Sequence, residues 1–345
     1  MGELIFVGLG LGSMGVSLEG VAAIKRADVC YLEYYTTPHE PALLHDLESA
    51  TGKQFTIVDR AFLEDGRKPL EEADKSVVVV AVPGDPMIAT THNDLRVRAI
   101  SRGINTSVVH AATIASAAAS ASGLHYYKFG KTITVTRDAV DLLEQVYHVV
   151  HENLKDGLHT LLLLEVDVDS GRGVSPEGTI RGLLKAEANF KRDVVSDETF
   201  AIVLNRIGRP NFKGDAGPFS KLKGLEHGEP PSVVVIPGTL HFTETEAIAA
   251  IFSQTPRDVH GNSDVKRTAQ VLIPRYLEKT RKAFASARPQ LGKEYDSLLE
   301  NVELYMRDAE EFLGKGEDEL AMLNIGYAEG LLDSVGFTGK AKIEW

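Results

Sequence analysis

Cysteine is almost absent from this sequence, which has one, Cys30, among 345 residues. A single cysteine excludes an internal disulfide and a zinc cluster built on cysteine ligands. Long apolar runs are absent too, since no segment approaches the roughly 18 apolar residues that a membrane span requires. The first residues lead directly into a short apolar segment instead of a basic region, so we expect no secretory signal. We therefore expect a cytoplasmic protein that does not associate with a membrane.

Basic residues are outnumbered by acidic ones, because 37 Lys and Arg stand against 49 Asp and Glu and give a net charge of −12. Sequence-independent binding to nucleic acid requires a basic face that displaces counterions from phosphates, so we expect no nucleic-acid partner. Hydrophobic residues make up 43% of the chain and charged residues 25%, which is typical of globular proteins with a sizeable core. A chain of this length predicts two or three domains.

Familiar catalytic patterns are missing as well. The sequence shows no Ser-His-Asp or Cys-His set, no Walker lysine and no H-E-x-x-H helix. Its 11 histidines are scattered, which favours structural or surface roles, so we expect no metal site. Because these patterns are absent, the sequence does not identify the catalytic side chains. Group transfer from a cofactor that carries its own leaving group depends on a shaped cleft more than on acids and bases, so it is compatible with these absences.

What the sequence does contain is a βα pattern organised around residues 77–92. Residues 77–82 are an unbroken apolar run, typical of a strand buried on both faces of a parallel sheet. The run ends in Pro83-Gly84-Asp85-Pro86, a stiff loop with one carboxylate, and Thr90 or Thr91 is expected to cap the next helix. Ligands of open α/β sheets bind at the carboxyl ends of such strands, so this loop is a candidate ligand site. An ordinary strand-to-helix turn is the alternative.

The first glycine-rich segment has two interpretations. Gly10, Gly12 and Gly15 match the dinucleotide fingerprint G-x-G-x-x-G, and Glu33 stands where that fingerprint places an acidic residue. The apolar helical pattern, however, begins only after Ser17, whereas a helix should begin inside the fingerprint. We therefore do not favour a nicotinamide or flavin site, although a dinucleotide-binding oxidoreductase or a catalytically silent binding module stays open as an alternative function.

The remaining pattern predicts two α/β domains followed by helices. The expected strands are residues 4–7, 29–32, 55–58, 77–82, 107–110, 160–166, 200–205 and 233–236. The expected helices of this part are residues 18–27, 41–49, 70–73, a small-residue helix within 111–123, 142–154, 176–190 with Ser175 as its cap, and 244–252. Thr113 opens the small-residue helix, where a hydroxyl and free N–H groups can meet a ligand. We place the domains at residues 1–127 and 128–253, a linker at 254–264 and a helical domain at 265–345.

The last domain is predicted to be entirely helical. The expected helices are residues 265–287, with an interruption at Pro274, 295–313 and 319–335, the last two forming an αα-hairpin hinged at residues 314–316. Apolar residues fall on one face of each hairpin helix, namely Leu298, Val302, Tyr305, Ala309 and Phe312, then Leu320, Leu323, Tyr327 and Leu331. The first helix is basic and the hairpin is acidic, so we favour their mutual packing over an external acidic partner.

Several separate motifs occur in an order that resembles one family. They are Gly8-Leu9-Gly10-Leu11, Pro83-Gly84-Asp85-Pro86 with Ala89-Thr90-Thr91-His92, Gly123-Leu124-His125 with Tyr127-Lys128-Phe129-Gly130, Gly157-Leu158-His159-Thr160-Leu161-Leu162, Pro230-Pro231, and Ile236-Pro237-Gly238-Thr239-Leu240-His241. Over residues 1–253 the chain resembles the diphthine synthases of the tetrapyrrole methylase superfamily. The C-terminal part resembles a small helical domain of unknown function found in archaeal proteins.

The resemblance implies a two-domain α/β enzyme that folds S-adenosylmethionine (SAM) into the cleft between its domains, plus the C-terminal all-α helical hairpin domain. It implies an N-methyltransferase of diphthamide biosynthesis, acting on the amino group of a 3-carboxy-3-aminopropyl histidine of translation elongation factor 2, and we expect a homodimer. A tetrapyrrole (precorrin-like) C-methyltransferase, which shares the fold and the cofactor, is the alternative. Similar proteins often have His where this chain has Ser232. The implied cofactor contacts are Leu11, Asp85, Ile88, Thr113, Ile114, Leu164, Ile207 and Ser232.

On this interpretation a neutral amine attacks a sulfonium methyl group in line, and the enzyme chiefly holds donor and acceptor in that geometry. Asp85 is expected to accept hydrogen bonds from the cofactor and to offset its positive charge. We also expect an aromatic side chain to contact the methylated ammonium through a cation–π interaction. The candidates by position are Tyr34, Tyr35, Tyr126 and Tyr127.

Overall fold

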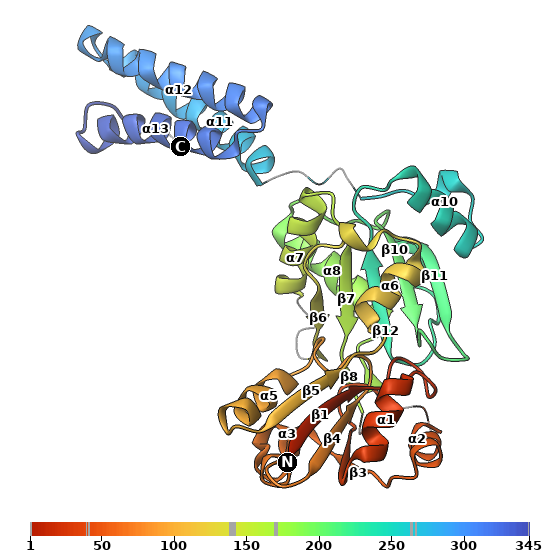
Figure 1. The fold of residues 1–345 in the computed structure, drawn as a ribbon. Helices are drawn as coiled ribbons and strands as arrows, with labels where there is room; N and C mark the ends of the chain where they lie inside the picture. Colours follow the sequence, from red (N-terminus) through yellow and green to blue (C-terminus); the bar gives the residue numbers. More distant parts are fainter. Residues whose placement is uncertain are drawn as a thin grey trace. The chain divides into compact units, whose positions relative to one another are not determined.

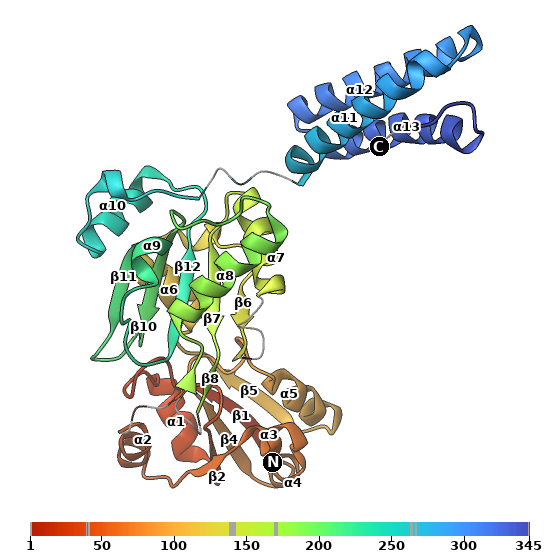
Figure 2. The same cartoon turned by 180° about the vertical axis from the view of Figure 1, so that it is seen from behind.

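The computed structural model of the chain describes residues 2–38, 40, 42–137, 143–168, 172–262, 265, 268–343 and 345. One compact unit comprises the residues up to 190 together with 195–263 and holds both α/β sheets, and the helices after residue 264 belong to a second unit (Figure 1, with the reverse view in Figure 2). Pro41, Leu142 and Asp264, which bound three of the predicted segments, lie outside the described residues. Among the residues that are described, no helix has both the length and the apolar character to cross a membrane.

The first sheet has five parallel strands in the order β3-β2-β4-β1-β5, so β4 and β1 lie away from its edges. Its strands are β1 (Glu3–Gly8), β2 (Val29–Glu33), β3 (Thr56–Val58), β4 (Val77–Val82) and β5 (Asn105–Val109). Its covering helices are α1 (Leu18–Arg26), α2 (Leu43–Thr51), α3 (Arg60–Asp65), α4 (Arg67–Ala73) and α5 (His92–Ser101). The predicted strands are confirmed to within about two residues, whereas α3 was not predicted.

Alternate side chains of β4 enter two different cores. Val78, Val80 and Val82 pack with residues of α3, α4 and α5, whereas Val79 and Ala81 pack with residues of α1 and α2. A strand covered by helices on both faces has no solvent-facing side, so its sequence reads as a continuous apolar run. The central position predicted for this strand is confirmed.

The two helix starts that matter for the site differ in their capping. Ser17 accepts a hydrogen bond from the Gly20 N–H at 3.0 Å, so α1 begins after the glycine fingerprint, as predicted. Thr91 occupies the N-cap position of α5, but its side chain makes no capping bond. The Thr90 hydroxyl instead donates to the Pro86 carbonyl at 2.7 Å. Thr91 is thus confirmed as the N-cap residue of α5, but the expected side-chain capping bond is absent, and the preceding loop holds the Thr90 hydroxyl.

The second sheet has the order β11-β10-β12-β7-β6, with β6 parallel to β7 and all other neighbours antiparallel. Its strands are β6 (Ile133–Val135), β7 (Thr160–Leu164), β10 (Phe200–Asn205), β11 (Lys213–Pro218) and β12 (Ser232–Ile236), and a small hairpin of β8 (Val166–Asp167) and β9 (Arg172–Gly173) follows β7. The helices of this part are α6 (Ile114–Ser122), α7 (Glu144–Lys155), α8 (Pro176–Phe190), α9 (Phe219–Leu222) and α10 (Phe242–Ile251), with short 3₁₀ turns at Tyr126–Lys128 and Pro256–Asp258.

Helix α6 follows the last strand of the first sheet but covers the second one (Figure 1). Its Ala118 is fully buried in a core with Phe200 and Ile202 of β10 and Val235 of β12. The small side chains of this helix therefore allow close helix–sheet packing, which is the plain explanation of its alanine-rich sequence.

Strand β11 was not predicted, and strand β7 ends two residues earlier than the predicted 160–166. The β11 sequence Lys213-Gly214-Asp215-Ala216-Gly217-Pro218 has no β-branched or aromatic residue, so it carries no strand pattern. In the part of the chain that the structure describes, it is an edge strand that pairs with β10 alone. Its antiparallel backbone pairing with β10 therefore defines it as a strand, because its side chains do not. The Ser175 hydroxyl accepts from the Gly178 N–H at 2.9 Å, which confirms the predicted cap of α8.

The second unit consists of α11 (Thr268–Ala287), α12 (Asp296–Lys315) and α13 (Asp318–Phe337), with 3₁₀ turns at Arg288–Gln290 and Lys293–Tyr295. Gly316 ends α12 in the left-handed conformation, which confirms the predicted hinge. Helix α11 continues through Pro274, so the predicted interruption is wrong. Ile273 and Leu277 on either side of that proline are buried in the core, and this packing offsets the lost backbone hydrogen bond.

Ion pairs join the basic first helix to the acidic hairpin. Lys279 of α11 lies 3.3 Å from Glu329 of α13, Arg281 lies 2.5 Å from Glu310 of α12, and Arg288 lies 2.7 Å from Glu303. The predicted mutual packing of these helices is confirmed.

The buried face of α13 differs from the predicted one. Leu320, Leu323 and Tyr327 are 40%, 51% and 55% exposed, so their assignment to the core face is wrong. The core instead takes Ala321, Asn324, Ile325, Ala328, Leu332 and Val335 from this helix. Two alanines on the inner face let the helices approach closely, and a pattern that follows only the large side chains misses this arrangement. In α12, Val302 and Ala309 are buried as predicted.

Two leucines of α13 test this assignment directly. Leu332→Ala removes a fully buried side chain and should lower the free energy of unfolding of the helical unit by about 2–5 kcal/mol. Leu323→Ala changes the same residue type on the exposed face and should cost less than about 1 kcal/mol. Urea titrations of the full chain, followed by helix circular dichroism, compare the two. Equal losses for both variants would contradict the assigned faces.

Candidate functional site

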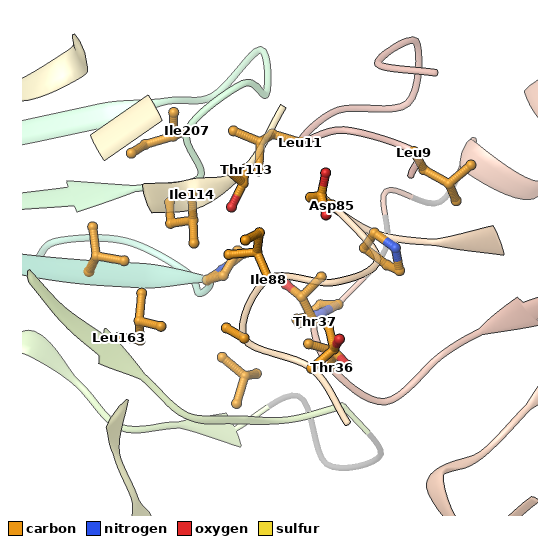
Figure 3. Close-up of a pocket in the computed structure, with 18 of the residues that line it drawn as sticks. Leu9, Leu11, Thr36, Thr37, Asp85, Ile88, Thr113, Ile114, Leu163 and Ile207 are labelled. Atoms are coloured by element: carbon orange, nitrogen blue, oxygen red, sulfur yellow. The ribbon is translucent and has the colours of Figure 1, made fainter. Parts of the chain in front are cut away.

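A cavity of about 540 Å³ lies where the carboxyl ends of the first sheet's strands meet residues of the second sheet (Figure 3). Small-molecule sites typically have about 300–1,000 Å³, so this volume suits a ligand of cofactor size. The first sheet contributes the loops after β1, β2, β4 and β5, and the second sheet contributes residues of β7, β10 and β12 and the turn after β10. The ligand crevice predicted at the carboxyl end of β4 is therefore present.

Backbone contacts join the loops that form this cavity. Gly10 and Gly84 exchange hydrogen bonds, with the Gly10 N–H 3.2 Å from the Gly84 oxygen and the Gly84 N–H 2.7 Å from the Gly10 oxygen. These bonds hold the loops after β1 and β4 together. At the edge of the leading loop, a Cβ on Gly12 would overlap the carbonyl oxygen of Gly208, which follows β10. Only glycine allows the two backbones to come this close.

Asp85 is held in place by its own loop and by the loop after β5. Its Oδ1 accepts from the Met87 N–H at 2.9 Å, and its Oδ2 lies 2.8 Å from His110 Nδ1 and 3.3 Å from the Ala111 N–H. The residue is 6% exposed and lines the cavity. A carboxylate fixed in this way keeps its position without a ligand, so it offers a preorganised negative group to a cationic one.

Helix α6 directs its N-terminus to the cavity. Thr113 is its N-cap residue and makes no side-chain capping bond, and Thr113 and Ile114 both line the cavity. The first N–H groups of a helix carry partial positive charge and lack partners within the helix, so this wall suits an anionic group. Figure 3 shows Thr113 and Ile114 beside Leu11 and Ile207.

The second sheet supplies a mainly apolar wall. Leu164 ends β7, Ile207 follows β10, and Ser232 begins β12. The Ser232 side chain donates a hydrogen bond to the Asn205 side chain, so its hydroxyl can act toward a ligand only as an acceptor. All of the implied cofactor contacts thus line the same cavity, although they come from separate segments of the chain: Leu11, Asp85, Ile88, Thr113, Ile114, Leu164, Ile207 and Ser232.

An ion-pair cluster at the cavity was not predicted. Glu40 lies 3.2 Å from Arg209 and 2.8 Å from Arg206, and Arg209 also donates to the Pro38 carbonyl at 2.5 Å. Burial lowers the pKa of Arg209, with Glu40 acting against this shift. The cluster joins a loop of the first sheet to the turn after β10, and no local sequence pattern could reveal a pairing over such a separation.

One of the four candidate tyrosines lines the cavity, and the other three do not. Tyr35 lines the cavity, whereas Tyr34, Tyr126 and Tyr127 are not among its lining residues. Tyr126 and Tyr127 are 64% and 78% exposed. The guanidinium of Arg60 lies 5.3 Å from the centre of the Tyr35 ring, so a protein cation already occupies a face of that ring. Of the four candidate tyrosines, Tyr35 is therefore the one that the structure places at the cavity.

The dinucleotide interpretation lacks structural support. Glu33, which would bind a ribose in that interpretation, is fully buried, and its Oε1 accepts from the N–H groups of Tyr35 and Thr36 at 3.1 and 2.7 Å. A Cβ on Gly15 would lie 2.6 Å from the Leu9 oxygen, so Gly15 shapes the loop itself and does not pack a helix against the strand.

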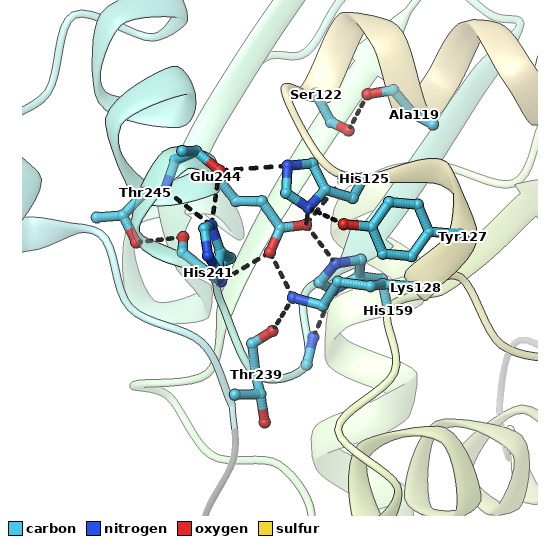
Figure 4. Close-up of polar contacts among 12 residues, drawn as sticks. Ala119, Ser122, His125, Tyr127, Lys128, His159, Thr239, His241, Glu244 and Thr245 are labelled. Atoms are coloured by element: carbon cyan, nitrogen blue, oxygen red, sulfur yellow. Dashed lines mark hydrogen bonds and ion pairs between the residues drawn. The ribbon is translucent and has the colours of Figure 1, made fainter.

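A second polar cluster gathers three of the motifs that carry the resemblance (Figure 4). Its centre is the fully buried carboxylate of Glu244 in α10. This carboxylate accepts from the N–H of His125 at 2.8 Å, the N–H of His241 at 2.8 Å, His159 Nε2 at 2.9 Å and the Lys128 ammonium. Burial alone would raise the pKa of Glu244, but these hydrogen bonds outweigh it and lower the value from 4.5 to about 2.

The tautomer of His159 in this cluster follows from its partners. The Gly238 N–H donates to His159 Nδ1 at 3.0 Å, so Nε2 carries the hydrogen that reaches Glu244. Burial lowers the pKa of His159 and keeps the ring neutral. None of these residues lines the cavity, so the cluster fastens the turn at Tyr126–Lys128 and α10 to β7. Within the described ranges, no group of three or more His, Cys, Asp or Glu side chains is placed to hold a metal ion.

Comparison with known proteins gives separate matches for the α/β part and for the C-terminal helical part of the chain. Residues 3–222 match the family Tetrapyrrole (Corrin/Porphyrin) Methylases, and residues 275–341 match a protein family of unknown function, DUF357. The diphthine synthase of Methanocella arvoryzae is 37% identical over 249 residues, covering 71% of this chain and 96% of the relative. That of Methanothermobacter thermautotrophicus is 34% identical over 258 residues, covering 74% and 97%. A crystal structure of diphthine synthase matches with a TM-score of 0.64 and 30% identity, covering 74% of this chain and 100% of the other.

The Glu244 cluster gives a pH-dependent prediction. Because the folded-state pKa is about 2 and the ordinary value is 4.5, the carboxylate stabilises the fold above about pH 4.5, and this contribution disappears as the pH falls toward 2. The difference corresponds to up to about 3 kcal/mol. Glu244→Gln should therefore destabilise the protein near neutral pH and flatten its loss of stability in acid.

Denaturant titrations at several pH values measure this effect, and Glu246→Gln is the matched control, since Glu246 is an exposed residue of the same helix. The control should follow the parent at every pH. A Glu244→Gln variant with the parent's stability and acid profile would contradict the assigned role.

Proposed function

This chain belongs to the diphthine synthases, within the family of tetrapyrrole methylases, and we propose that it methylates the amino group of a 3-carboxy-3-aminopropyl histidine on translation elongation factor 2. Enzymes of this family are SAM-dependent methyltransferases, and so is this chain. The observation that carries the substrate proposal is the similarity to diphthine synthases over more than 70% of the chain. The convergence of separate loops on one cavity supports the cofactor.

The chemistry of the cavity residues fits SAM. Leu11, Ile88, Ile114 and Ile207 offer apolar contact to an adenine ring, and the fixed carboxylate of Asp85 offsets a positive charge. The N-terminus of α6, with the Thr113 hydroxyl, suits the carboxylate of the methionine part. When bound, SAM supplies a methyl group together with its own leaving group. The protein's task is then to orient the acceptor amine and to exclude water.

The acceptor amine must lose its charge before it can attack. Transfer into a largely apolar cavity disfavours an ammonium, so the surroundings contributed by Leu163, Leu164 and Ile88 lower the pKa of the bound amine. Orientation and desolvation together account for an enzyme whose sequence shows no nucleophile or metal motif.

We further propose that the limits at residues 1–127 and 128–253, the linker at 254–264 and the helical domain at 265–345 are the domain limits of this enzyme. The first limit is supported by the turn at Tyr126–Lys128, which precedes β6. Helix α6 precedes this limit in the chain, although it packs against the second sheet. We also propose a homodimer, which light scattering can test against a chain mass of 37.5 kDa. A cytoplasmic location follows from the proposed substrate, which acts in translation.

Methyl transfer to the elongation factor tests the function directly. Incubation of the enzyme and SAM with elongation factor 2 that carries the aminopropyl intermediate should add whole methyl increments to that histidine, detected by peptide mass spectrometry. Unmodified elongation factor should gain none, because its histidine lacks the amine. Transfer to a precorrin, with none to the elongation factor, would contradict the proposal in favour of the alternative methyltransferase.

Asp85 provides a separate test of the cofactor site. Charge-assisted hydrogen bonds contribute about 1.5–3 kcal/mol, so Asp85→Ala should weaken SAM binding by roughly tenfold to a hundredfold in titration calorimetry. Asp74→Ala, an exposed aspartate outside the cavity, should bind SAM like the parent. Parent-like affinity in Asp85→Ala, or binding of NAD(H) instead of SAM, would contradict the assignment.

A further inference from the structure

A chain of polar side chains leads from the cavity wall into the core of the first sheet. Tyr35 lines the cavity, and its hydroxyl lies 3.3 Å from Nε2 of His92. His92 is 2% exposed, and its Nε2 lies 3.9 Å from Oε2 of Glu33, which is fully buried. The site described above uses neither His92 nor Glu33.

The hydrogen bonds of His92 fix its tautomer. Its Nδ1 lies 3.2 Å from the Pro86 carbonyl oxygen, which can only accept, so Nδ1 carries a hydrogen. Burial lowers the pKa of His92 more than the charge of Glu33 raises it, and the ring is therefore neutral near pH 7. Nε2 then presents a lone pair to Tyr35, whose hydroxyl donates to it.

Glu33 is positioned to stabilise a proton on His92. Its Oε1 accepts from the N–H groups of Tyr35 and Thr36, which orients the carboxylate so that Oε2 faces the His92 ring. A fixed carboxylate beside an imidazole favours the imidazolium, as in other buried carboxylate–histidine pairs. Glu33 is thus a positioning residue that makes proton acceptance by His92 more favourable.

The proposed reaction requires such an acceptor. An alkylamine is an ammonium near pH 7, and every methyl transfer produces an ammonium again, so a proton must leave the nitrogen before each attack. We propose that Tyr35 and His92 form the proton acceptor for the substrate amine, with Tyr35 touching the substrate and His92 taking the proton. This inference rests on the proposed function.

The proton balance of this step is simple. The substrate N–H bond breaks as its proton moves to the Tyr35 oxygen, and the former Tyr35 hydroxyl proton moves to Nε2 of His92, which becomes an imidazolium. The freed nitrogen lone pair then forms a bond to the methyl carbon while the carbon–sulfur bond breaks, leaving a neutral thioether. After product release the proton returns through the Tyr35 oxygen to water.

Charged groups from three elements face this pair. Glu33 ends β2, Arg60 and Glu64 lie on α3, and Asp94 and Arg98 of α5 line a small cavity beside His92. Burial, with the charge of Glu33, raises the pKa of Tyr35 to about 12, so the hydroxyl stays protonated and passes a proton on without becoming a resting tyrosinate.

Tyr35→Phe removes the hydroxyl and keeps the ring, so it separates proton acceptance from packing. Single-turnover methyl transfer to the modified elongation factor, measured with saturating SAM from about pH 7 to about pH 9, is the assay. The variant should lose about a hundredfold in rate near pH 7 and recover toward the parent as the pH rises, because more substrate then arrives as free amine. Its SAM affinity in calorimetry should stay within about threefold of the parent.

His92→Gln should show the same pH-dependent loss, and Tyr126→Phe, an exposed tyrosine outside the cavity, should follow the parent at every pH. Parent-like rates in Tyr35→Phe would overturn the inference. A rate loss of equal size at all pH values would also overturn it, because such a loss indicates that Tyr35 only positions the substrate. An inactive parent enzyme that binds SAM would overturn the proposed substrate and this inference with it. If the parent enzyme is active and Tyr35→Phe shows parent-like rates, or a rate loss that is equal at all pH values, only this inference is overturned and the proposed function stands.

Discussion

The close approach of two backbone loops is the constraint on which the site depends. Gly12 of the first sheet's leading loop meets Gly208 of the turn after β10, and Gly208 itself leaves no room for a Cβ, which would lie 2.7 Å from that of Leu11. The hydrogen bonds between Gly10 and Gly84 then fix the leading loop to the loop that carries Asp85. Because these contacts involve backbone atoms, they set the width of the cavity with little dependence on side-chain rotamers.

Two buried or half-buried polar clusters hold this arrangement. Glu40 with Arg206 and Arg209 joins segments at the cavity, and Glu244 with Lys128 and His159 fastens the outer part of the second sheet. A buried charge that loses its partner is strongly destabilising, so such clusters specify one arrangement even where their net contribution to stability is small. The cavity itself contains Asp85, whose carboxylate is oriented by the N–H groups of Met87 and Ala111 and by His110, and it lines the cavity where a cation can reach it.

The sequence predicts those features that depend on local periodicity and on the residue types of a single loop. The β4 run, the Pro83–Pro86 loop and the late start of α1 after Ser17 are all properties of short segments, and each is confirmed. The edge strand β11 lacks any side-chain pattern, and the inner face of α13 is built on alanines, so neither follows from large apolar residues. The pairing of Glu40 with Arg209 joins residues far apart in the chain. The cofactor contacts came from the family resemblance, not from periodicity.

The most direct test of the account is a crystal structure of the enzyme with S-adenosylhomocysteine, the product of methyl transfer from SAM. The account predicts the ligand in the cavity between the Asp85 loop and the β7–β12 wall, with its amino-acid end near the N-terminus of α6 and its sulfur on the side of Tyr35. A ligand bound elsewhere, or a cavity closed by the Gly12 and Gly208 loops with the ligand excluded, would contradict it.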